Sequence, residues 1–126
     1  MAARRDVYLA YARPDGAGAR FRLFSGRRAA IAWASRLLKL EPAPDSLREL
    51  RLAADAGAAV EAVRLLARDP LRPYSAVAEA NTTAIRLHLE PSEAAAADLE
   101  RRLRDAAPAD TRIESALVEV PGAHFA

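Results

Sequence analysis

Cysteine is absent from this 126-residue chain, lysine occurs once, and only 6% of the residues are aromatic. The absence of cysteine excludes a disulfide framework, a thiolate nucleophile and a zinc site built on sulfur. No apolar run approaches the roughly 20 residues that a membrane-spanning helix needs. The basic start of the chain leads into a short alternating segment rather than a signal-peptide core. We therefore expect a cytoplasmic protein with no membrane partner.

Alanine and arginine are abundant instead, and their distribution along the chain is uneven. Hydrophobic residues make up 52% of the chain, which is long enough for a single domain over residues 1–126 to bury a core. Residues 1–40 contain nine basic and two acidic side chains, a net charge of +7. Residues 41–126 contain ten basic and fifteen acidic side chains, a net charge of −5. Opposite net charges on two parts of one surface favour association with a protein partner or with a second copy of the chain.

The clearest structural signal is a β-α-β unit over residues 83–120. Residues 83–90 alternate in polarity, which predicts a half-buried strand. Its apolar side consists of Ile85, Leu87 and Leu89, and its polar side of Arg86, His88 and Glu90. Ser92 is the expected N-cap of the helix that follows, and residues 112–120 return to a β-rich pattern.

Residues 1–40 predict a β-hairpin followed by a helix. The turn is expected at residues 14–18, where Asp15 and Gly16 favour chain reversal. Beyond the helix, residues 45–68 predict a helical middle segment that Gly57 interrupts. For residues 50–54 the sequence allows either a helix or a strand, and for residues 71–81 it allows extended or single-turn structure.

Alternating strands predict a sheet with one open face, because strands covered on both sides are continuously apolar. We therefore expect an α+β fold, a two-layer sandwich with a mostly antiparallel sheet of four to five strands and helices on one face. The C-terminal β-α-β part resembles half of a ferredoxin-like fold in element order, and this resemblance implies no function. No internal repeat is evident in the sequence.

Two groups of side chains are candidates for a binding site. The first group lies in the basic, aromatic-rich N-terminal part, and the second lies on the strand at 83–90. The candidates are Tyr8, Arg20, Arg22, Phe24, Arg27 and Arg28 in the first group, and Arg86 and His88 in the second. His88 could act as a general base, but the sequence places no nucleophile near it. His88 and His124 have no metal-ligand spacing, so we expect no catalytic residue, metal or cofactor.

These observations favour a non-catalytic protein-interaction module that forms a homodimer through its open sheet face. One alternative is a single-stranded nucleic-acid-binding protein that uses the basic aromatic hairpin, because arginines interleaved with aromatic rings can hold unstacked bases. A second alternative is a small-molecule enzyme that uses the open sheet face.

Overall fold

The computed structural model describes residues 4–14, 18–55, 57–66, 73–81 and 84–120. The turn predicted at residues 14–18 lies partly outside the described residues, and His124 lies wholly outside them. The strands are β1 (Arg4–Ala12), β2 (Arg20–Phe24), β3 (Ala58–Leu66), β4 (Ser75–Ala80), β5 (Ile85–Glu90) and β6 (Arg112–Glu119). The helices are α1 (Arg27–Leu37), α2 (Leu47–Ala54) and α3 (Glu93–Ala106).

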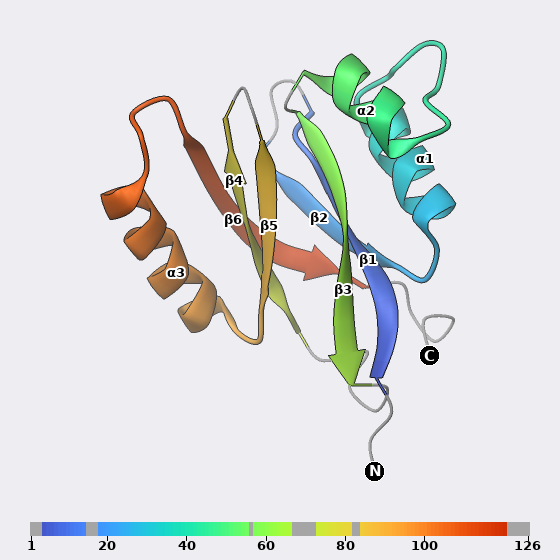
Figure 1. Cartoon of the computed structure of the whole chain (residues 1–126). Coiled ribbons are helices and arrows are strands. Elements are labelled where there is room, and N and C mark those ends of the chain that lie inside the picture. The colour runs from blue at the N-terminus through green and yellow to red at the C-terminus, as the bar shows by residue number, and fades with distance from the viewer. Residues whose placement is uncertain (1–3, 15–17, 56, 67–72, 82–83, 121–126) are drawn as a thin grey trace.

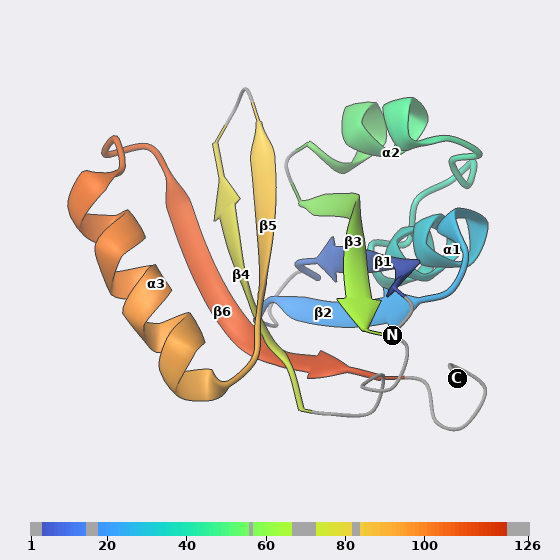
Figure 2. The same ribbon diagram turned by 60° about the horizontal axis from the view of Figure 1, so that its bottom comes forward.

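The six strands form one mixed sheet in the order β3-β1-β2-β6-β4-β5, in which only the β2–β6 pair is parallel among the described pairings. The sheet curls strongly, so that β3 and β5, at its two ends, approach each other and the shape is nearly a barrel (Figures 1 and 2). The α+β class predicted from the sequence is confirmed. The two-layer sandwich and the ferredoxin-like arrangement are not, and the sheet has more strands than expected.

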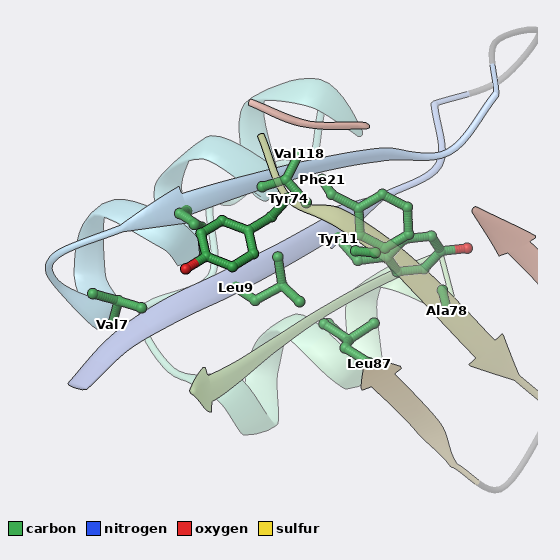
Figure 3. Packing of buried hydrophobic residues seen from close by; sticks show 11 residues of the cluster. Val7, Leu9, Tyr11, Phe21, Tyr74, Ala78, Leu87 and Val118 are labelled. Atoms are coloured by element: carbon green, nitrogen blue, oxygen red, sulfur yellow. The ribbon is translucent and has the colours of Figure 1, made fainter. Parts of the chain in front are cut away.

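The concave face of the sheet forms the main hydrophobic core. Figure 3 shows Leu9, Tyr11 and Phe21 pointing into the space enclosed by the curled sheet, where Leu87 meets them from β5. Burying a large apolar side chain contributes about 1.5–3 kcal/mol. The expectation of an open sheet face is therefore wrong, because the face without helices folds onto itself.

All three helices pack on the convex face, with α1 and α2 over β1–β3 and α3 over β4–β6 (Figure 1). Under α1 the strand surface consists largely of small residues, with Ala10 and Ala12 facing Ala30 and Ala34. Small side chains on both surfaces let the helix approach the sheet closely. The alanine-rich composition thus has a packing role.

The helical middle segment predicted for residues 45–68 is only half right. Residues 47–54 form α2, capped by Ser46, whose hydroxyl accepts the backbone N–H of Glu49 at 3.1 Å. Residues 58–66, predicted as helix, form β3, which pairs with the whole length of β1. Gly57 separates the two elements, and a Cβ there would lie 2.9 Å from the carbonyl oxygen of Ala54. Residues 71–81, undecided from the sequence, include β4.

The β-α-β unit predicted for residues 83–120 is present as β5, α3 and β6, with Ser92 capping α3 as expected. Leu87 is buried and Arg86 is exposed, whereas Ile85, His88 and Leu89 are half-buried. The strands β5 and β6 run parallel to each other on either side of β4.

The topology also contains a repeat that the sequence did not indicate. The first half runs β1, β2, α1 and α2, β3, with strand order β3-β1-β2. The second half runs β4, β5, α3, β6, with strand order β6-β4-β5. Phe21 lies six residues before the start of α1, and Leu87 lies six residues before the start of α3. The chain is thus two β-β-α-β units joined side by side through β2 and β6.

Candidate interaction surface

The alternation of β2 divides its side chains between the core and the convex surface. Phe21 and Leu23 face the core, so Arg20, Arg22 and Phe24 face the convex side, next to α1. Tyr8 of β1 pairs with Phe24 and lies on the same face. The structure therefore brings together most of the N-terminal residues that the sequence proposed, although on the helix-bearing face rather than on an open one.

Arginine side chains lie against each aromatic ring of this region. The guanidinium carbons of Arg20 and Arg22 lie 5.6 Å from the ring centres of Trp33 and Phe24, respectively. Phe24 packs on Trp33, with ring centres 5.7 Å apart. One cation–π contact at an exposed site is worth about 0.5–1 kcal/mol. The rings of Trp33 and Phe24 thus each have an arginine against them, which reduces the ring surface open to a stacked base.

Arg27, at the start of α1, completes this arrangement, with its guanidinium carbon 5.5 Å from the ring centre of Tyr8. Tyr8 and Phe24 are half-buried and Trp33 is buried. A guanidinium stacked on a ring keeps its edge N–H groups available to acceptors on a partner.

Glu119 of β6 is the acidic member of the region. It accepts two hydrogen bonds from Arg20, at 2.9 Å each, and lies 3.7 Å from Arg22. The hydrogen bonds to Glu119 raise the pKa of Arg20 above its ordinary value, while partial burial opposes this shift. Because the side chains of Arg20 and Glu119 remain 42% and 37% exposed, the pair contributes little to stability.

Leu117 supplies an exposed apolar side chain beside these charges. It directly precedes Val118, which pairs with Phe21 of β2, and its side chain lies on the same face as Glu119. Leu117 is 54% exposed, and in the described part of the chain it is one of two large hydrophobic side chains that are exposed, the other being Leu52. The Nε atom of Arg22 is buried and has no hydrogen-bond partner within the described part of the chain.

We call this region the basic-aromatic patch. Its residues are Tyr8, Arg20, Arg22, Phe24, Arg27, Leu117 and Glu119. It combines three arginines, one glutamate and an exposed leucine around rings that are already packed. Leu117 and Glu119 were not predicted as site residues. The alternation of polar and apolar residues over 112–119 was the available signal. However, Leu117 and Glu119 lie next to β2 only because β6 pairs with β2, and the sequence does not reveal that pairing.

The other predicted site residues lie elsewhere. Arg28 lines a groove on another side of α1, together with Arg36 and Lys39. Arg86 and His88 lie on β5, which β6 and β4 separate from β2. His88 Nε2 lies 3.7 Å from a carboxylate oxygen of Glu79, beyond hydrogen-bond distance. The structure therefore does not join the two predicted groups into one site.

A second polar cluster, which sequence reasoning missed, lies at one end of the barrel core. The hydroxyl of Tyr11 donates to Glu114 at 2.9 Å and accepts from Arg112 at 3.0 Å. Arg13 and Arg112 each donate to a different oxygen of Glu114, at 3.0 and 2.9 Å. Figure 3 shows the Tyr11 hydroxyl pointing away from the apolar cluster. Polar residues at core-facing strand positions were the only sequence signal for this cluster.

The cluster perturbs two of its own groups. Burial raises the pKa of Tyr11, and the neighbouring Glu114 adds to this effect while Arg112 opposes it. Burial alone would lower the pKa of Arg112, but its contacts with Tyr11 and Glu114 raise it overall. These contacts join β1 to β6 across the core, so they also stabilise the curled shape of the sheet.

Within the residues that the structure describes, no group of three or more potential metal ligands comes together. No helix in the same part of the chain has the length and hydropathy needed to cross a bilayer. Comparisons with protein-family models, with curated proteins and with solved structures find no match to this chain.

Proposed function

We propose that this protein is a non-catalytic interaction module that binds an acidic protein surface through the basic-aromatic patch. The observation that carries the proposal is the exposed Leu117, which lies beside arginines already ordered on aromatic rings. Ordered arginines and aromatic side chains are enriched at protein interfaces and lose little conformational entropy on binding. A partner that presents carboxylates around an apolar side chain would complement both features.

The composition of the patch argues against the other candidate ligands. Single-stranded nucleic acid is bound by stacking bases on ring faces, and here an arginine already lies against the rings of Phe24 and Tyr8, while Phe24 also packs on Trp33. Glu119 would also lie close to any phosphate held by Arg20. A second copy that docked with the same patch would bring together two surfaces with three arginines and one glutamate each, and these would repel.

A defined probe tests the proposal. We expect a labelled synthetic peptide of glutamate and leucine to bind wild-type protein with an affinity that falls as salt increases. The Arg20→Ala, Arg22→Ala double variant and the Leu117→Ser variant should each bind about tenfold more weakly or worse. Arg86→Ala, which removes an exposed arginine from β5, is the matched control and should bind like wild type. Thermal unfolding of each variant verifies that the fold is intact.

Three results would contradict the proposal. One is equal peptide affinity in the patch variants and in wild type. Another is binding of a single-stranded oligonucleotide at physiological salt that the double variant abolishes, because this would favour the nucleic-acid alternative. The third is a concentration-dependent dimer, measured by light scattering, that Leu117→Ser dissociates. That outcome would identify a second copy as the partner.

A further inference from the structure

A polar pocket of about 570 Å³ lies where β1 ends and the C-terminal ends of α1 and α2 meet. Its volume falls in the range of small-molecule sites, about 300–1,000 Å³. The charged lining residues are Arg13, Lys39, Asp55 and Arg112, and the apolar ones include Leu37, Leu38 and Leu40. The pocket shares no residue with the basic-aromatic patch, so this inference is independent of the proposed function.

The charges in the pocket have both signs. Arg13 is 47% exposed and uses its Nε atom to hold Glu114. Lys39 and Asp55 are exposed, and the side chain of neither has a hydrogen-bond or ion-pair partner within the described ranges, although the backbone N–H of Lys39 donates to the carbonyl oxygen of Arg36. The pocket thus presents cationic groups together with a separate carboxylate.

The backbone gives a second, independent observation. Among the described residues, Lys39 and Asp55 are the only non-glycine residues with positive φ, at 54° and 46°. Each lies just beyond a helix, at a position where glycine or asparagine is favoured. Both of these conformationally disfavoured residues line the same pocket, and each carries a charge. Disfavoured backbone of this kind clusters at ligand sites.

We propose that this pocket binds a small zwitterion, a free α-amino acid with an apolar side chain. Its carboxylate would contact Arg13 and Lys39, and its ammonium group would contact Asp55. The carbonyl ends of α1 and α2 carry partial negative charge and add to the attraction for the ammonium group. The apolar side chain of the ligand would pack on the leucines of the lining. Neither a simple anion nor a simple cation matches both signs of charge.

Titrations with L-leucine and two analogues test this proposal. The analogues are 4-methylpentanoate, which lacks the amino group, and isopentylamine, which lacks the carboxylate. We expect millimolar leucine to raise the melting temperature of the full chain, because a ligand that binds only the folded state stabilises it. Amide chemical shifts should change at residues 37–40 and 53–57. Both analogues should bind about tenfold more weakly or worse.

Lys39→Asn and Asp55→Asn separate binding from folding. Asparagine tolerates positive φ, so each variant should be at least as stable as wild type while its leucine affinity falls about tenfold. Arg48→Ala, which removes an exposed charge on α2 outside the pocket, should bind leucine normally. The proposal is overturned if leucine produces no shift, if 4-methylpentanoate binds as well as leucine, or if both asparagine variants keep wild-type affinity.

Discussion

The carboxylate of Glu61, on β3, accepts the backbone N–H of Leu87, on β5, with an N–O distance of 3.0 Å. The two β-β-α-β units thus meet at two places, β3 with β5 and β2 with β6. At the second place, β2 and β6 form a parallel ladder that includes the pair Phe21 and Val118. In the described part of the chain β3 and β5 form no ladder, so a side chain supplies the acceptor there. This contact holds together the two ends of the curled sheet.

Glu61→Ala should destabilise the protein by about 1–3 kcal/mol, because it leaves the part-buried amide of Leu87 without an acceptor. Denaturant unfolding measures this loss. Hydrogen exchange at the Leu87 amide should also become faster than exchange in the β1–β2 ladder. Glu61→Gln is the control, since its amide oxygen can still accept the bond, and it should lose less stability. Equal losses in the two variants would show that the contact with Leu87 is unimportant.

Leu87 and Arg86 are neighbours on β5 with opposite surroundings. Leu87 is only 7% exposed and packs in the main core, so Leu87→Ala should lower the free energy of unfolding by about 2–5 kcal/mol. Arg86 is exposed, and Arg86→Ala should change the free energy of unfolding by no more than about 0.5 kcal/mol. Chemical denaturation of both variants checks the prediction. Similar losses at the two positions would mean that both faces of β5 are buried.

Tyr11→Phe removes a hydroxyl that bridges Arg112 and Glu114. Because both partners are charged, the loss at neutral pH should be about 1.5–3 kcal/mol. Burial raises the pKa of Tyr11 in the folded state above the ordinary value of 10.0. The contribution of Tyr11 to the free energy of unfolding is therefore fully present below pH 10.0 and is lost as the pH rises through its folded-state pKa. The stability difference between wild type and variant should therefore shrink in strong alkali.

Tyr8→Phe is the matched control for this experiment, because no hydrogen bond of the Tyr8 hydroxyl is present within the described residues. Its effect at neutral pH should stay within about 0.5 kcal/mol. Unfolding curves recorded from neutral to strongly alkaline pH compare the three proteins. A Tyr11→Phe variant as stable as wild type at neutral pH would contradict the bridging role.

Ser115 on β6 donates a 2.6 Å hydrogen bond to Glu100 of α3. This bond, followed by the bond from Arg104, lowers the pKa of Glu100. Ser115→Ala should therefore raise that pKa and cost about 0.5–1.5 kcal/mol at neutral pH. Because the pKa of Glu100 is lower in the folded state than in the unfolded state, Glu100 stabilises the fold at pH values above its unfolded-state pKa. This contribution to the free energy of unfolding is lost as the pH falls through the folded-state pKa.

Unfolding at neutral and at acidic pH, with an NMR titration of the Glu100 carboxylate, measures both effects of Ser115→Ala. The difference from wild type should fade in acid. Asp98→Ala is the control, because its partners Arg101 and Arg102 are largely exposed, and it should change stability by at most about 0.5 kcal/mol. An unchanged Glu100 pKa in Ser115→Ala would refute the assignment.

The parts of the fold predictable from the sequence are those that local signals determine. The strand containing Leu87 and the helix capped by Ser92 were found because polarity alternation and capping act over a few residues. Residues 58–66 were misread because their alanines favour helix, and pairing with β1 overrides that preference.

The candidate sites could be predicted only in part, for a related reason. The arginines and aromatic residues of β2 and α1 are close in sequence, so their grouping was visible. Leu117 and Glu119 join them only through the pairing of β2 with β6. Tyr11 and Glu114 are 103 residues apart, and their contact follows from the curling of the sheet, which no local pattern specifies.

The two β-β-α-β units are not interchangeable. At equivalent positions of their hairpins, the first unit places Tyr11 opposite Phe21, whereas the second places Ala78 opposite Leu87. Large side chains from one unit fill the space that small side chains of the other leave. Two copies of the first unit would overcrowd a shared interior, and two copies of the second would leave it hollow. Each unit therefore requires the other as a partner with side chains of complementary size.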